Sequence, residues 1–84
     1  MQTLQELGAS VAERRRALGL QQGEVAARTG LSQASLSRFE RGKVAEFGSR
    51  KLLSVLAVLG MELSLAEIGA AGSLDELRRE RSGA

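Results

Sequence analysis

A three-residue gap between two short helical segments constrains the fold of this chain more than any other feature. Residues 22–28 and 32–41 both place apolar side chains at helical spacing, and only three residues centred on Gly30 separate them. Three residues allow nothing but a sharp turn, which the backbone freedom of Gly30 permits. Ser32 can then cap the start of the second segment with its hydroxyl. The sequence therefore predicts two short helices joined by a tight turn.

Two further helices are predicted on either side of this pair. Thr3 begins a capping-box pattern at the start of the first helix, and Gly19 ends that helix. The fourth helix is expected to begin near Ser49 or Arg50 and to end before Gly60. Its expected inner residues are leucines: Leu52, Leu53, Leu56 and Leu59. The fold class predicted from these segments is all-α.

The apolar pattern changes its period after residue 60. Met61, Leu63 and Leu65 alternate with polar or small residues, which indicates a half-buried strand. A lone strand has no partner in an otherwise helical monomer, so pairing with the same strand of a second copy would give a two-fold dimer. These three residues are therefore the candidates for dimerisation. The alternative is a fifth short helix over residues 65–68 that packs across the dimer axis.

The last fifteen residues are predicted to lie outside the folded domain. We expect one domain over residues 1–69 and a flexible tail over residues 70–84. Residues 73–76 form another capping-box pattern, so a short helix over residues 74–81 is possible. Eight residues are too few to hold a helix in isolation. We therefore expect the tail to be mobile until it binds something.

Composition argues against catalysis and against a metal site. The 84 residues include no cysteine and no histidine, which excludes a disulfide scaffold and the usual zinc clusters. The commonest general base and the commonest thiol nucleophile are missing for the same reason. The nearest acidic pairs for a small hydrolase, Glu6 with Glu13 and Asp75 with Glu76, have no predicted pocket around them. We expect no enzyme activity, no metal and no cofactor.

The sequence also bears on where the protein acts. The longest nearly apolar run, residues 52–61, is far shorter than the roughly 20 residues needed to cross a bilayer. The N-terminus lacks the basic and then apolar pattern of a secretory signal. We therefore expect a cytoplasmic protein with no membrane partner.

Basic residues are concentrated in the middle of the chain. Residues 14–51 hold nine of the 12 lysines and arginines but only three of the 10 acids. Such a concentration is typical of a protein that binds a polyanion. Phe39 and Phe47 are the only aromatic residues, so a base-stacking platform for single strands or RNA loops is not expected.

The second helix of the central pair has side chains suited to reading bases. Leu36 and Phe39 are expected to fix one face of this helix to the domain. The opposite face would then present Gln33, Ala34, Ser37 and Arg38. Glutamine can pair with adenine, arginine with guanine, and the alanine methyl can contact a thymine methyl. Two helices with a glycine-containing turn and such an outer face form a helix-turn-helix arrangement.

The stretch LGLQQGEVAARTGLSQASLSRFERGK at residues 18–43 resembles the Cro/C1 (XRE) helix-turn-helix family of bacterial and phage repressors. The resemblance covers about residues 4–60. It implies a lambda-repressor-like DNA-binding domain of four to five helices. It also implies a dimer that places the second helix of the pair in successive major grooves of a palindromic operator.

The resemblance implies a role for individual residues. Gln33, Ala34, Ser37 and Arg38 match the base-reading positions of the family. Gln22 matches a glutamine that anchors a phosphate, and the positions that contact the DNA backbone are matched by Ser35, Arg41 and Lys43. A partly buried ion pair is implied between Arg15 and Glu40. The chain departs from the family pattern at Gln21 and Gly23. Both residues weaken the intrinsic stability of the helix predicted over residues 22–28.

The region after the helix-turn-helix is similar to HipB-type antitoxins. The similarity lies in residues 46–53 and 59–63. It implies a strand that pairs across a dimer and a HipA-like kinase toxin as a partner. On this interpretation Leu74 and Leu77 are candidate toxin contacts, and a disordered terminus is the alternative for them.

These expectations combine into one functional prediction. The protein is predicted to be a sequence-specific repressor that binds double-stranded operator DNA as a homodimer and regulates its own operon. It would be associated with the nucleoid and could be the antitoxin of a HipA-like kinase. The alternatives are a solitary phage-type or bacterial regulator without a toxin, and an antitoxin that mainly binds protein.

Overall fold

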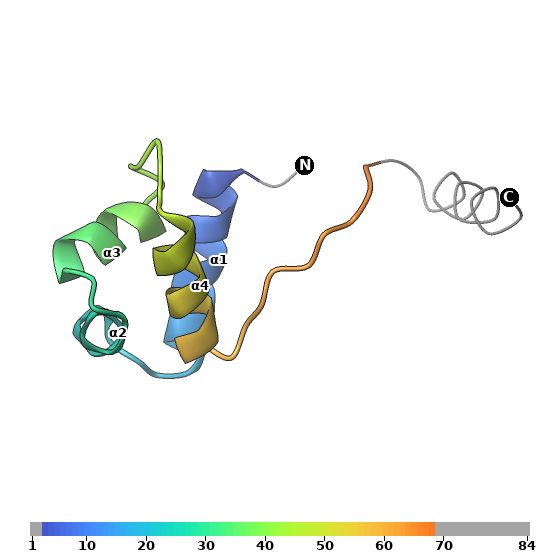
Figure 1. Ribbon diagram of the computed structural model, residues 1–84. Helices are drawn as coiled ribbons and strands as arrows, with labels where there is room; N and C mark the ends of the chain where they lie inside the picture. The colour runs from blue at the N-terminus through green and yellow to red at the C-terminus, as the bar shows by residue number, and fades with distance from the viewer. Residues whose placement is uncertain (1–2, 69–84) are drawn as a thin grey trace, which may run out of the picture.

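The computed structural model describes residues 3–68, and four helices form the folded part of this range (Figure 1). They are α1 (Leu4–Ala17), α2 (Gln22–Thr29), α3 (Gln33–Glu40) and α4 (Ser49–Val58). Helices α2 and α3 lie to one side of α1 and α4, and α3 packs on both α1 and α2. The all-α prediction is confirmed for the described residues. Across them, every helix is too short or too polar to span a membrane.

The predicted helix starts are formed by local side-chain hydrogen bonds. The Thr3 hydroxyl accepts a hydrogen bond from the backbone N–H of Glu6 at 3.1 Å, and the Ser32 hydroxyl accepts one from Ser35 at the same distance. Gly30 ends α2 with a φ of 75°, in the left-handed region that favours glycine. The turn between α2 and α3 is therefore set by the residues that the sequence analysis identified.

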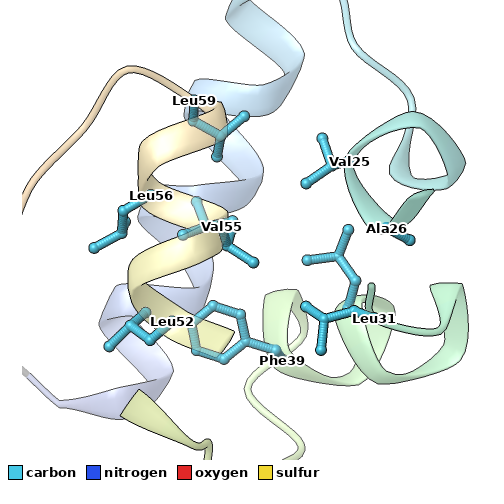
Figure 2. Close-up of a cluster of buried hydrophobic side chains, with 10 residues drawn as sticks. Val25, Ala26, Leu31, Phe39, Leu52, Val55, Leu56 and Leu59 are labelled. Carbon is cyan, nitrogen blue, oxygen red and sulfur yellow. The ribbon is translucent and has the colours of Figure 1, made fainter. Parts of the chain in front are cut away.

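A single apolar cluster joins all four helices. Leu36 and Phe39 of α3 are both completely buried, so the inner face of α3 is the one predicted. Figure 2 shows Phe39 directed toward Leu52 and Val55 of α4, with Val25 of α2 on the far side of the cluster. The buried members are Val11, Val25, Ala26, Leu31, Leu36, Phe39, Leu52, Val55, Leu56 and Leu59. This cluster holds α3 in place and leaves its other face outside.

One predicted core residue of α4 lies on the surface. Leu53 is 53% exposed, and Val55 is completely buried in its place. An α-helix turns by about 100° per residue, so positions at a spacing of three and four share a face. Leu52, Val55 and Leu56 therefore face the core together, and Leu53 points away from them. The prediction that Leu53 is an inner residue was wrong.

The approach of α1 to α3 depends on Gly8. This residue is buried, and a Cβ atom added to it would lie 2.0 Å from the backbone carbonyl oxygen of Phe39. No real Cβ atom approaches an oxygen so closely, so any other residue would force the two helices apart. The backbones of α1 and α3 therefore pack in direct contact at this point.

Residues 61–68 form neither a strand nor a helix in the described chain. Met61 packs against the core and donates its backbone N–H to the carbonyl of Leu56 at 2.8 Å. Beyond it the chain extends away from the four helices (Figure 1). A strand needs hydrogen-bond partners from a neighbouring segment, and residues 3–60 offer only helices and loops. Neither the expected strand nor the alternative fifth helix over residues 65–68 is formed in the single chain. Pairing with a second copy stays a prediction.

The remaining predictions for the C-terminus fall outside the described residues. They concern the tail over residues 70–84, its short helix over residues 74–81, and the candidate toxin contacts Leu74 and Leu77.

Candidate nucleic-acid interface

The four candidate base-reading residues share the outer face of α3. Gln33, Ala34 and Arg38 are exposed, and Ser37 is half-buried. The opposite face of the same helix is completely buried. Because the core fixes that inner face, the outer face has a defined orientation on the domain. It offers a carboxamide, a methyl group, a hydroxyl and a guanidinium, the groups that recognise base edges in a major groove.

The candidate backbone contacts Arg41 and Lys43 directly follow α3, and both are exposed. The Nε of Arg41 donates to the carbonyl of Ser37 at 3.3 Å, so the Arg41 side chain lies back along its own helix. The backbone N–H of Lys43 donates to the carbonyl of Arg38 at 2.9 Å, which fixes the start of the following loop. Two exposed cations thus follow the C-terminal end of the outer face, and the side chain of Arg41 is held against it.

The candidate backbone contact Ser35 lies at the other end of α3 and takes part in its N-terminal cap. The Ser32 hydroxyl donates to the Ser35 hydroxyl at 2.9 Å. The Ser35 side chain is half-buried, and it also lines a hollow beside α3. Its hydroxyl is therefore bonded locally before any phosphate could approach it.

Arg15 of α1 and Glu40 of α3, predicted to pair, form a bidentate ion pair. The Nε of Arg15 donates to one Glu40 oxygen at 2.7 Å and Nη2 to the other at 2.9 Å. The two side chains are 11% and 2% exposed, so the pair is largely shielded from water. Arg15 also donates from Nη1 to the carbonyl of Leu20 at 2.9 Å. One guanidinium therefore holds α1, the loop before α2 and the end of α3 together.

The Arg15 guanidinium is held in its charged form. Hydrogen bonds to Glu40 raise the pKa of Arg15 above its ordinary value, and the attraction of the Glu40 charge adds to them while burial acts in the opposite direction. The Arg15 guanidinium thus stays charged throughout the physiological range.

Gln22, a candidate phosphate anchor, belongs to the same network. Its Nε2 donates to a Glu40 oxygen at 2.9 Å. Glu40 therefore accepts hydrogen bonds from α1 and from α2 at once, and it joins both helices to α3. One N–H of the Gln22 amide is bonded to this carboxylate. This bond also fixes the orientation of the rest of the amide. The sequence analysis did not anticipate this bond.

Two further contacts were missed by the sequence analysis. Arg14 is an exposed residue of α1, and its Nε donates to the carbonyl of Leu59 at 3.0 Å. A cation at the C-terminal end of α4 also complements the helix dipole. The rings of Phe39 and Phe47 stack with centroids 4.1 Å apart and an interplanar angle of 4°. This stack attaches the loop between α3 and α4 to the core.

The hollow beside α3 has a volume of about 170 Å³ and opens between α3 and the start of α4. Its walls combine the end of α3, the following loop and the first turn of α4: Ser35, Arg38, Val44, Glu46, Phe47, Gly48 and Lys51. Sequence reasoning missed it because Arg38 and Lys51 come from different helices. Residues 3–68 contain no group of three or more aspartate, glutamate, cysteine or histidine side chains that could hold a metal ion.

Comparison with known proteins identifies the family. The sequence profile of a family described as a helix-turn-helix domain matches residues 1–66 of the 84-residue chain. No curated protein matches the chain. The profile covers all four helices, including the α2–turn–α3 unit and its outer face. The chain therefore belongs to the helix-turn-helix domain family, whose members bind DNA and are typically not enzymes.

Proposed function

We propose that this protein is a transcriptional repressor that reads a specific sequence of double-stranded DNA with α3 and binds its operator as a homodimer. The outer face of α3 carries this proposal. It presents Gln33, Ala34, Ser37 and Arg38 together, on a helix whose other face is buried in the core. The bound dimer would act by occupancy, because it excludes polymerase from the promoter.

Phosphate contacts around this face would set the register of α3 on the duplex. Arg41 and Lys43 are exposed at its C-terminal end and are the cations best placed for that role. Gln22 and Ser35 lie at the N-terminal ends of α2 and α3 and would contribute neutral donors. The bonds that already hold these two side chains would orient them before DNA arrives, which lowers the entropy lost on binding.

Dimerisation is proposed to use the segment that follows α4. Leu63 and Leu65 are 44% and 100% exposed, which is costly for large apolar side chains on a monomer. Met61, at the base of the segment, lines a second hollow of about 180 Å³ together with Leu7 and Leu56. A second copy could pair its own residues 61–68 with this segment, so that the two segments form strands together and bury these apolar groups. This arrangement supports a two-fold dimer and a palindromic operator.

Titration of the protein against two duplexes tests the proposal. One duplex carries the DNA immediately upstream of the gene, and the other carries the same bases in scrambled order. Binding is followed by fluorescence anisotropy at two salt concentrations. We expect tighter binding to the upstream duplex and a steep loss of affinity for both as salt rises.

The same titration decides between the proposed repressor and its rivals. Preference for the upstream duplex supports an autoregulatory repressor, whether or not a toxin partner exists. Weak and equal binding to both duplexes would contradict the proposal and favour an antitoxin that mainly binds protein. Purification from the native host, with a search for a co-purifying kinase, then separates a toxin–antitoxin pair from a solitary regulator.

A further inference from the structure

The hollow between α3 and α4 places Arg38 beside two charged residues that the proposed function does not use, Glu46 and Lys51. Arg38 reaches it from the outer face of α3, and Lys51 reaches it from the first turn of α4. The Lys51 stem runs beside Gly48, because a Cβ atom at Gly48 would lie 3.9 Å from both Cγ and Cδ of Lys51. Lys51 and Gly48 therefore form adjacent parts of the wall of the hollow.

Glu46 is the single acid among the residues that line this hollow. Its side chain is exposed, as are those of Arg38 and Lys51. Among residues 3–68, none of these three side chains takes part in a hydrogen bond or an ion pair within 4.0 Å. Each charge is therefore available to respond to what approaches the outer face of α3.

The position of Glu46 opposes the binding of DNA in general. A DNA duplex against α3 would bring its phosphates close to the same hollow, and a carboxylate there repels them. Glu46 and Arg38 line the same hollow without forming an ion pair in the free protein. Arg38 would have to turn toward Glu46 to pair with it, which we expect when the base in front of Arg38 is not a guanine. Arg38 would otherwise bind a phosphate of any sequence, which strengthens binding to unrelated DNA.

We propose that Glu46 is a specificity-determining residue that weakens binding to unrelated DNA more than binding to the operator. The inference rests on the proposed function. On the operator, Arg38 binds its guanine whether or not Glu46 is present. On unrelated DNA, Glu46 holds the Arg38 guanidinium away from the phosphate backbone. Discrimination is thus gained by lowering the affinity for the wrong partner.

The test is Glu46→Gln, compared with Glu13→Gln as a matched control. Both variants remove one negative charge from an exposed glutamate, but Glu13 lies on α1 outside the hollow. We expect Glu46→Gln to tighten binding to the scrambled duplex about fivefold, and to the upstream duplex by less. Glu13→Gln should change either affinity by less than about twofold, because salt screens a distant exposed charge. Thermal unfolding should be unchanged in both variants.

Each other outcome overturns the inference in a recognisable way. If both variants tighten binding equally, net charge explains the effect and Glu46 has no special position. If Glu46→Gln tightens both duplexes by the same factor, Glu46 does not determine specificity. A wild type that binds the two duplexes equally would overturn the proposed function and this inference with it. If the wild type prefers the upstream duplex and Glu46→Gln keeps that preference unchanged, this inference is overturned and the proposed function stands.

A double variant tests whether Glu46 acts through Arg38. In the Arg38→Ala background, Glu46→Gln should have a smaller effect on the scrambled duplex, because no guanidinium remains for Glu46 to hold. The same fivefold gain in both backgrounds would overturn the role given to Arg38.

Discussion

Gly8 of α1 lies directly against the backbone of Phe39 in α3, with no room between them for a methyl group. A Cβ atom at Gly8 would lie 2.0 Å from the Phe39 carbonyl oxygen and 3.0 Å from its carbonyl carbon. The obstacle is backbone at the end of the helix proposed to read DNA, so it cannot move aside as a flexible side chain would. The contact sets how closely α3 packs on the domain.

Replacing Gly8 by alanine should therefore destabilise the protein. In an exposed helix this change gains about 1 kcal/mol, but here overpacking should cost about 1–3 kcal/mol. We expect the midpoint of thermal unfolding, followed by circular dichroism, to fall by several degrees, since about 1 kcal/mol corresponds to roughly 4–8 °C at this size.

Gly23→Ala is the matched control for Gly8→Ala. Gly23 lies on the exposed side of α2, where an added Cβ would meet the Gln33 side chain at an ordinary 3.5 Å. This variant should gain about 1 kcal/mol from helix propensity alone. Equal stabilisation by the two alanines would show that α1 and α3 are not in backbone contact.

The ion pair between Arg15 and Glu40 should contribute to the stability of the fold mainly because each charge would otherwise be buried without a partner. Arg15→Met or Glu40→Leu alone should each cost about 3–5 kcal/mol, because the remaining charge loses its partner. The double variant should lose much less than the sum of the two. Urea unfolding of all four proteins measures the coupling, and additive losses would contradict it.

The pH dependence of the ion pair follows from the raised pKa of Arg15 in the folded protein. A cation whose pKa is higher in the folded state stabilises fully below its unfolded pKa, and the stabilisation is lost as pH rises past the folded value. For Arg15 both values are strongly alkaline. Its contribution to the coupling should therefore be the same at neutral and at mildly alkaline pH.

Arg38→Ala should remove the preference for the operator while the fold persists. Arg38 is exposed on α3, and its side chain makes no hydrogen bond within residues 3–68. Loss of one bidentate base contact should cost about 1–3 kcal/mol on the upstream duplex. Anisotropy titration gives the two affinities, and circular dichroism checks the fold. An upstream affinity equal to that of the wild type would remove Arg38 from the base-reading residues.

Lys43→Ala should weaken binding to every sequence alike. Lys43 is exposed just beyond α3, where a phosphate contact would carry no sequence information. The slope of log affinity against log salt should become shallower by about one unit. Arg28→Ala, which removes an exposed cation at the far end of α2, is the control. A slope unchanged by Lys43→Ala would exclude Lys43 as a phosphate contact.

The parts of this fold that could be predicted from the sequence are those set by neighbouring residues. The starts of α1 and α3 lie where predicted, because a capping hydroxyl and the amide it serves are three residues apart. The outer face of α3 follows from the spacing of Leu36 and Phe39. These short-range rules were enough to locate the candidate base-reading residues.

The parts that could not be predicted depend on contacts between segments far apart in the chain. From the sequence, Gly8 is only a residue of low helix propensity, and its contact with α3 becomes apparent in the structure. Arg14 looks like an ordinary surface cation, yet it bonds to a carbonyl 45 residues away. The apolar alternation from Met61 to Leu65 indicates a strand, but a strand needs a partner that residues 3–60 do not supply.

Leu65→Glu tests whether that partner is a second copy of the chain. Leu65 is completely exposed, so the change should leave the stability of the monomer within about 0.5 kcal/mol. A charge placed opposite its own symmetry mate would repel it across a two-fold interface, and the dimer should dissociate. Sedimentation equilibrium would then report a monomer for this variant and a dimer for the wild type.

The matched control is Leu53→Glu, because Leu53 is a leucine of α4 that is 53% exposed and lies outside the segment. It introduces the same charge into the same kind of exposed leucine, and it should leave the dimer intact. Dissociation by both variants would place the interface on α4 as well. A dimer that survives Leu65→Glu would show that residues 61–68 do not form the interface.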